Sequence, residues 1–392
     1  MIPTRETPYG SRLASIDCLR GLAVLAVLVH HVLRMSFPEK SLFWIQEWVN
    51  TADLGVRGVA LFFVISGFCI HMPWARRKAE GADTHVGFLH FWKRRLWRLY
   101  PPYFVALTGG MILMLLLASI GKYGAVTPDY YPGYRFQVGV DYLLHLTMLH
   151  GFVPLYDGAG TNPPFWTLAR EEYLYLLYFG LLFCRTRSSA WTSTLAALVA
   201  GIGFRLAMGA LMGEHATGWS LVTTSAIVLW IQWALGMLAV EGALGLVRLP
   251  AWTRQLLLVP AWIAVAAYVD VHAPLLSPLC WGLAFFTLIN WAVTTELARR
   301  WPARGAEWLR RTGVISYSIY LTHWPSVWLA VALMHLVLGD RTLTPSKLGY
   351  AAQLAYILVV GYGTGWLYFQ LVERRFLNTR EAAAPAVAVA AL

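Results

Sequence analysis

The sequence predicts an all-α integral membrane protein, a bundle of about ten transmembrane helices. Hydrophobic residues make up 58% of its 392 residues and charged residues only 13%, a composition typical of membrane-embedded chains. A helix needs about 20 apolar residues to cross a hydrocarbon core of roughly 30 Å. Apolar runs near this length lie at 14–34, 56–74, 99–118, 165–184, 190–212, 218–240, 255–270, 275–296, 314–337 and 347–371.

The basic residues predict which ends of these spans face the cytoplasm. The net charge of +11 would by itself also suit a nucleic-acid-binding protein. With ten spans and an internal N-terminus, however, roughly two thirds of the 31 Lys and Arg fall in cytoplasmic segments, as the positive-inside rule requires. We therefore expect a multi-pass protein of the cytoplasmic (inner) membrane with both termini in the cytoplasm, embedded in the lipid bilayer and without a nucleic-acid partner.

One further apolar segment, 138–155, is not counted as a span. If it crossed the membrane fully, the basic residues at 185–187 and 299–304 would face outward, against the positive-inside rule. We expect it to be re-entrant or to lie on the outer surface. Residues 1–376 are then expected to form a single transmembrane domain, and 377–392 a disordered cytoplasmic tail.

The cysteines do not predict a metal centre. Cys18, Cys69, Cys184 and Cys280 lie in or beside apolar runs and lack the paired spacing of metal ligands. Phosphate-binding loops, nucleophile elbows and zinc-binding helix motifs are also missing from the sequence. We expect no metal and no permanently bound cofactor.

The first span carries three polar residues within LRGLAVLAVLVHHV. Charged or ionisable groups inside an apolar run are costly, so each suggests a function. Arg20 and His31 are eleven residues apart, which places them within about 20° of the same helical face and about 16 Å apart along the axis. His30 is about 80° from that line. Arg20 and His31 are expected to share a groove, unless Arg20 reaches the inner surface and both histidines lie at the outer interface.

The second span contains two small residues at mid-depth, Ser66 and Gly67 in LFFVISGFCI. Small residues there usually permit close helix packing. Packing is the favoured interpretation, and a substrate contact by Ser66 is the alternative.

The third span is preceded by paired arginines in FWKRRLWRLYPPY. Arg95 and Arg98 are three residues apart and lie on one helical face. Guanidinium groups in this arrangement suit phosphate better than lysines do. The alternative is that a basic interfacial helix binds anionic lipid headgroups.

The fourth span opens with three consecutive charges in FWTLAREEYLYLLY. Arg170 can neutralise one of the carboxylates of Glu171 and Glu172. A desolvated glutamate beside a histidine would instead form an acid–base pair. In the expected topology Glu171 and His31 both lie in the outer half of the membrane, so contact between them is allowed.

The ninth span repeats polar residues every third position in SYSIYLTHWP. Tyr317, Tyr320 and His323 therefore line one helical face. Pro325 frees the backbone carbonyl of Leu321, one turn earlier. This face is expected to line a substrate site or pore, or to form a hydrogen-bonded packing network.

Taken together, these five segments resemble the acyltransferase 3 family of membrane-bound O-acyltransferases. The motifs occur in the family's order and cover residues 16 to about 325. The resemblance implies a ten-helix bundle that takes an acyl group, usually acetyl, from cytoplasmic acyl-CoA. The acceptor would be a hydroxyl of a carbohydrate, such as a surface polysaccharide, a lipid-linked glycan or a glycosylated natural product.

The resemblance also assigns residues. The family's basic residue and histidine fall on Arg20 and His31, its paired arginines on Arg95 and Arg98, and its glutamate on Glu171. Two positions depart from the pattern, because Thr167 replaces the usual serine and Ala60 replaces an acidic residue. Without a fused hydrolase-like domain, the chain resembles stand-alone members that transfer directly or rely on a protein partner that the sequence does not identify.

These residues combine into a mechanistic hypothesis. Arg95, Arg98 and Arg20 would bind the CoA phosphates, and the pantetheine arm would carry the thioester towards His31. His31 would act as general base or acyl carrier, with Glu171 orienting or charging it. Ser66, Tyr317, Tyr320 and His323 would line the substrate site. The main alternative is a transporter or flippase for an anionic lipid or sugar, and a structural partner in glycan assembly is a third.

Overall fold

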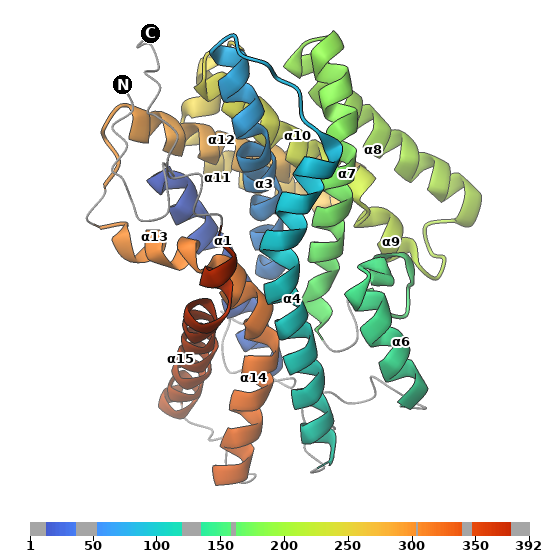
Figure 1. Cartoon of the computed structure of the whole chain (residues 1–392), viewed down its shortest axis with the longest axis vertical. Helices are drawn as coiled ribbons and strands as arrows, with labels where there is room; N and C mark the ends of the chain where they lie inside the picture. Colours follow the sequence, from blue (N-terminus) through green and yellow to red (C-terminus); the bar gives the residue numbers. More distant parts are fainter. Residues whose placement is uncertain are drawn as a thin grey trace.

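The computed structural model describes residues 13–36, 53–119, 135–157, 162–302, 305–338 and 347–377. This part of the chain is helical and contains no strands (Figure 1). Each predicted span coincides with a helix, and seven helical segments among the described residues are long and apolar enough to cross a membrane. The helices at the predicted spans are α1 (Ala14–Ser36), α3 (Leu54–Ala79), α4 (Phe88–Ser119), α7 (Trp166–Arg187), α8 (Ala190–Met212), α10 (Ala226–Ala243), α11 (Leu258–His272), α12 (Ser277–Leu297), α14 (Ser316–Leu338) and α15 (Lys347–Leu371).

Two of the predicted spans depart from a single long helix. The span at 218–240 is divided into α9 (Trp219–Thr223) and α10. The division falls at Ser225, whose side chain accepts a hydrogen bond from the backbone N–H of Val228 and so caps α10. The seventh helix, α11, has only 15 residues and is about 22 Å long.

The segment at 138–155 is not a continuous helix. It consists of α6 (Arg135–Leu146), which has 12 residues, and the 3₁₀ turn η1 (Leu149–Phe152). Met148 separates them in the left-handed region, with φ 58°. A helix of 12 residues is about 18 Å long, too short for a hydrocarbon core. The expectation that this segment does not cross as an eleventh span therefore agrees with its structure, whereas most of the expected tail, 378–392, lies outside the described residues.

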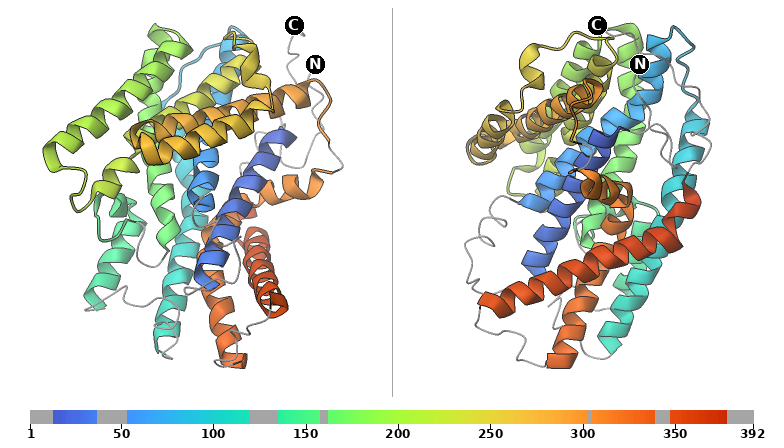
Figure 2. Two further views of the ribbon diagram at one scale, coloured as in Figure 1. Left: turned by 180° about the vertical axis from the view of Figure 1, so that it is seen from behind. Right: turned by 90° about the vertical axis from the view of Figure 1, so that its left-hand side faces the viewer.

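Helix α1 lies between two groups of helices. It packs against α3 and α12 on one side, and against α14, α15 and the short helix α13 (Glu307–Val314) on the other. The first group continues from α3 to α10 and α8, while α4 packs on α14 in the second (Figure 2). Residues on α1 can therefore contact both groups.

Glycines allow these helices to approach closely. A Cβ atom at Gly67 of α3 would collide with the carbonyl oxygen of Trp233 on α10, and one at Gly236 would collide with that of Val64. The prediction that the small residues of the second span permit close packing is thus confirmed for Gly67. A similar reciprocal contact joins α1 to α13 through Gly21 and Gly313, and it fixes α1 near Arg20.

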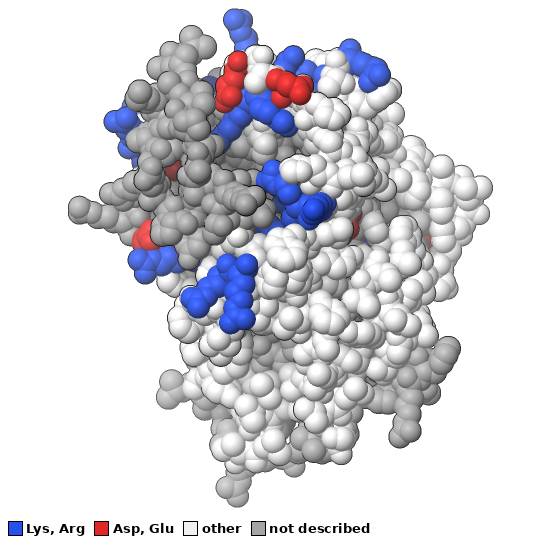
Figure 3. All heavy atoms as spheres, in the orientation of Figure 1, with Lys and Arg blue, Asp and Glu red and all other residues white. Residues whose placement is uncertain are grey.

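On the face shown in Figure 3, the charged side chains of the described residues gather towards one end. In Figure 3 the visible Lys and Arg side chains gather over the upper part of the face, and its lower half is almost uncharged. At the charged end, Glu296 of α12 accepts hydrogen bonds from the backbone N–H groups of Ala14 and Ser15, both at 2.8 Å. This carboxylate satisfies the first donors of α1 and suits the positive end of its helix dipole.

Candidate active site

His31 faces α14 across the interior of the bundle. Its ring centroid lies 5.0 Å from that of His323 and 5.3 Å from that of Trp324, both on α14. The Nδ1 atom of His31 is 2.9 Å from the carbonyl oxygen of Val27, one turn earlier in α1. His31 is therefore held by its own helix and presents its ring to His323.

His30 points in a different direction. Its Nε2 atom lies 3.7 Å from a carboxylate oxygen of Asp53, just before α3. The ring is buried, and a Cβ atom at Gly55 would collide with it. The two adjacent histidines thus contact different helices, as the 100° step between consecutive helical residues predicts.

The polar face of α14 contacts three other parts of the bundle. The hydroxyl of Tyr317 donates to the carbonyl of Leu99 on α4 at 3.0 Å. The hydroxyl of Tyr320 donates to the carbonyl of Pro164 at 2.6 Å and lies 2.5 Å from that of Thr167. The threonine that replaces the family's serine therefore supplies the same hydroxyl group to the site.

Pro325 has the consequence that the sequence predicts. It lacks the N–H that would bond to the carbonyl of Leu321, and the side-chain amide of Asn162 donates to that carbonyl instead, at 3.3 Å. Asn162 directly precedes η2 (Pro163–Phe165) and α7. The interrupted turn of α14 thus joins the start of the helix that carries Glu171.

Glu171 is held by two hydroxyl groups. Ser66 of α3 donates to its Oε1 atom at 2.9 Å, and Tyr175 donates to the same oxygen at 2.5 Å. Ser66 therefore contacts a candidate catalytic residue as well as lying in a closely packed helix. Within the described residues, Glu171 makes no hydrogen bond or ion pair with His31 or His323, so any effect of this carboxylate on His31 is indirect.

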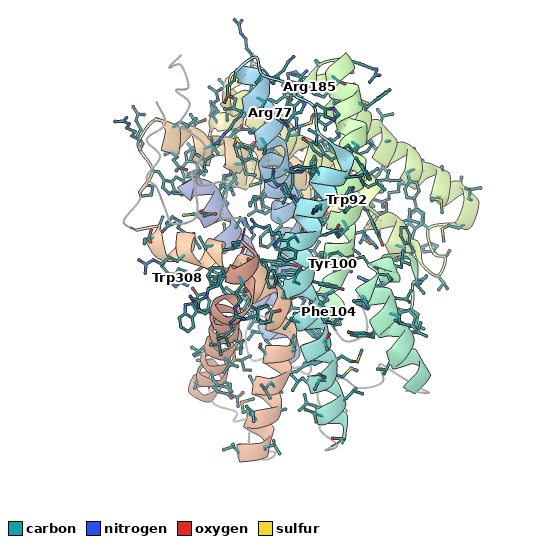
Figure 4. All side chains as sticks on the ribbon, viewed as in Figure 1. Arg77, Trp92, Tyr100, Phe104, Arg185 and Trp308 are labelled. Carbon is teal, nitrogen blue, oxygen red and sulfur yellow. The ribbon has the colours of Figure 1, made fainter. Side chains whose placement is uncertain are left out.

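A pocket lies beside this carboxylate between α4, α7 and α14. Tyr100 is seen at mid-length on α4 in Figure 4, and Tyr317 closes the pocket from α14. The pocket brings a pair of glutamates together with three phenol groups. The hydroxyls of Tyr317 and Tyr103 already donate to backbone carbonyls, and their oxygens can still accept a hydrogen bond from a substrate hydroxyl. Its lining residues are Leu99, Tyr100, Tyr103, Met148, Leu168, Glu171, Glu172 and Tyr317.

The candidate phosphate-binding arginines occupy two places. The Arg95 guanidinium lies over the rings of Phe91 and Tyr175, with its central carbon 5.7 and 5.6 Å from their centroids. Arg98 and Arg20 instead lie within electrostatic reach of Glu373. Arg95 is therefore nearer the Glu171 pocket, whereas Arg20 and Arg98 share an acidic neighbour.

Glu373 is a buried carboxylate that the sequence analysis did not single out. It begins the 3₁₀ turn η6 (Glu373–Phe376) and accepts hydrogen bonds from the backbone N–H and the hydroxyl of Ser318, at 3.1 and 2.5 Å. Burial raises the pKa of this carboxyl, and the bonds from Ser318 and the charges of Arg98 and Arg20 oppose that rise. An acidic residue inside the basic sequence ERR was the available signal.

Arg170 does not neutralise its neighbouring glutamates. Its Nη2 atom lies 3.0 Å from both carboxylate oxygens of Asp157. The same guanidinium donates to the carbonyls of Gly151 and Thr224 at 2.9 and 2.8 Å. Arg170 therefore links α7 to η1, to the segment after η1 and to the residues just before α10. The two glutamates line the pocket instead.

A second buried polar cluster, also missed from the sequence, joins α3, α7 and α10. The Nε2 atom of His71 lies 3.0 Å from Glu241, and Nδ1 lies 3.1 Å from the hydroxyl of Tyr178. Arg185, at the upper end of α7 in Figure 4, donates to both oxygens of Glu241. Because these groups satisfy one another, we interpret the cluster as a structural link.

The described residues contain no group of three or more His, Cys, Asp or Glu arranged to hold a metal ion. All four cysteines are free thiols. The candidate site itself brings several kinds of ionisable and hydroxyl side chains together. It combines two imidazoles, two carboxylates and several hydroxyl groups inside the bundle with guanidinium groups nearer its charged end.

The fold and this set of side chains define a membrane-embedded protein suited to group transfer. Comparison with known families gives the particular class, because the model of the acyltransferase domain matches residues 13–369. The chain belongs to the acyltransferase 3 family, as its five motifs indicated.

Two relatives illustrate the range of this family. The acyltransferase MdmB of Streptomyces mycarofaciens is 26% identical over 95% of this chain and 91% of its own length. The peptidoglycan O-acetyltransferase OatA of Listeria monocytogenes is 24% identical over 85% of this chain, which spans only 52% of that relative. No solved structure matches the chain. The curated relatives support an O-acyltransferase.

Proposed function

We propose that this protein moves an acyl group, specifically acetyl, from cytoplasmic acyl-CoA to a hydroxyl of a carbohydrate. The observation that carries the proposal is the placement of Arg20 and His31 along α1. Arg20 lies within electrostatic reach of Glu373, which accepts a hydrogen bond from Ser318 of α14, and His31 contacts His323 of the same helix. Both residues therefore lie towards the side of the bundle that contains α14. Their axial separation of about 16 Å suits an extended pantetheine arm.

In this proposal the arginines receive the donor and the histidine performs the chemistry. Arg95, Arg98 and Arg20 bind the phosphates of acyl-CoA at the charged end of the bundle. In this proposal that end faces the cytoplasm. His31 accepts the proton of the acceptor hydroxyl through Nε2, because its Nδ1 is committed to the carbonyl of Val27.

The pocket next to Glu171 is proposed to hold part of the substrate. Ser66 and Tyr175 fix the orientation of the carboxylate, and Tyr317 lines the same pocket. Tyr320 connects this region to His323, since their ring centroids are 5.4 Å apart. In this proposal Glu171 contacts the part of the substrate that lies in the pocket. Its effect on His31 is indirect and passes through the neighbouring Tyr320. Among the residues that the structure describes, no contact specifically favours the transporter alternative.

The test is the loss of acylation in a deletion strain. Mass spectrometry of surface glycans, lipid-linked glycans and secreted glycosides should show a species that loses one acyl mass and regains it when the intact gene is restored. Membranes containing the protein should release free CoA thiol from acetyl-CoA when that glycan is added. Unchanged glycan masses together with no acceptor-dependent thiol release would contradict the proposal.

A further inference from the structure

His31 and His323 form an opposed pair of imidazoles in the interior of the bundle. They come from α1 and α14, and their rings are tilted by 49° at a centroid separation of 5.0 Å. His323 is completely buried, and Trp324 lies edge-on against His31. At this separation one small group can contact both rings.

The hydrogen bonds of the pair determine where each ring carries its proton. Nδ1 of His31 lies 2.9 Å from the carbonyl of Val27, and Nδ1 of His323 lies 2.7 Å from the carbonyl of Tyr320. A carbonyl oxygen only accepts hydrogen bonds, so each neutral ring must carry its proton on Nδ1. Each Nε2 atom is therefore left with a lone pair.

The Nε2 atom of His323 has no hydrogen-bond partner within the described structure, although it is buried. Such an atom is costly in a stable interior, because it has lost water without gaining a partner. Glu171 does not supply one, since its carboxylate is bonded to Ser66 and Tyr175. The nearest titratable side chain shown to contact this ring is His31.

We propose that His323 is a second catalytic base and that the pair carries the transferred proton. The proposal rests on the acyl transfer proposed above. Nε2 of His31 takes the proton of the acceptor hydroxyl while the oxygen of that hydroxyl forms a bond to the thioester carbon. The carbon–sulfur bond then breaks, and the proton passes from His31 to Nε2 of His323 and onward to the leaving sulfur.

This sequence leaves the protein unchanged at the end of a cycle. The hydroxyl loses one proton and the CoA thiolate gains it, so no oxidant, reductant or solvent proton is required. Both rings return to the neutral form with Nδ1 protonated. That return matters because a lasting charge at a buried position such as His323 would be costly.

The experiment compares two matched histidine variants in purified protein. His323→Asn retains a side-chain amide that can donate to the carbonyl of Tyr320 but removes the base. The reaction is acyl transfer from acetyl-CoA to the glycan or glycoside identified in the deletion strain. We expect its kcat to fall at least about 100-fold, the scale of general acid–base catalysis, with an unchanged KM for acetyl-CoA. His30→Asn is the control, because His30 is also buried and its ring is also 5.1 Å from that of His31. It should keep kcat near the wild-type value.

A second variant separates lost chemistry from lost structure. His323→Ala should bind acetyl-CoA, unfold near the wild-type temperature and recover part of its rate when free imidazole is added. A His323→Asn protein with near-wild-type kcat, or a folded His323→Ala protein that imidazole does not restore, would overturn the proton relay while leaving the proposed function intact. Wild-type protein that fails to transfer from acetyl-CoA would contradict the proposed function and the relay with it.

Discussion

Arg170 and Glu171 are adjacent in sequence and have different surroundings. Only 1% of Arg170 is exposed, and its guanidinium is bonded to a carboxylate and two backbone carbonyls. Glu171 has two hydroxyl donors and faces a pocket. The first arrangement is that of a structural residue, because all its bonds are internal. The second leaves a carboxylate available to a substrate.

We therefore expect Arg170→Ala to act on stability. The substitution leaves Asp157 and two carbonyls without their donor, and breaking a buried ion pair costs about 3–5 kcal/mol. Denaturant or thermal unfolding in detergent should show a loss of this size. Arg187→Ala is the control at the exposed end of the same helix and should change stability by less than about 0.5 kcal/mol. A stable Arg170→Ala protein would show that these bonds contribute little.

Single-residue predictions succeeded where they depended only on helix geometry. The 100° step separated His31 from His30 and placed Tyr317, Tyr320 and His323 on one face. It did not reveal Glu373 or the link between His71 and Glu241. Those contacts join residues that are far apart in sequence, and no periodic pattern records such a pairing.

At the scale of elements, glycines set the distance between helices. Gly67 and Gly236 remove the side chains that would keep the backbones of α3 and α10 apart. Because Ser66 adjoins Gly67, this close crossing also sets where the Ser66 hydroxyl meets Glu171. Helix packing and the geometry of the candidate site are therefore coupled at one position.

Gly67→Ala should weaken this crossing. The added methyl group collides with the carbonyl of Trp233, which cannot rotate away, and overpacking of this kind costs about 1–3 kcal/mol. The unfolding temperature in detergent should fall, and acyl transfer should fall with it. Gly203→Ala on α8 is the matched control, because its new Cβ atom meets nothing within 4 Å. If both variants were equally stable, the α3–α10 crossing would not depend on glycine.

Element boundaries were harder to predict than element positions. The apolar run at 218–240 gives no sign of its division, which depends on the cap formed by Ser225. The third span was placed at 99–118, yet α4 begins at Phe88 and includes both Arg95 and Arg98. Hydropathy identifies the membrane-embedded residues, whereas a helix continues until its backbone bonding ends.

At the scale of the whole molecule, α1 connects the charged end of the bundle to the candidate site. Its first turn is capped by Glu296, Arg20 lies near Glu373, and His31 contacts α14 deeper in the bundle. The class of fold followed from composition and from the lengths of the apolar runs. The packing order of the helices could not be predicted in this way, because apolar helix faces of similar composition do not specify which helix they contact.

Acyl transfer through His31 is the central claim, and one measurement tests it most directly. Membranes with equal amounts of wild-type, His31→Ala and His30→Ala protein would be given acetyl-CoA and the acceptor glycan, and the release of free CoA thiol would be followed. We expect thiol release from wild-type and His30→Ala membranes and none above background from His31→Ala. Release by His31→Ala at the wild-type rate would contradict the assignment of His31 as the catalytic residue.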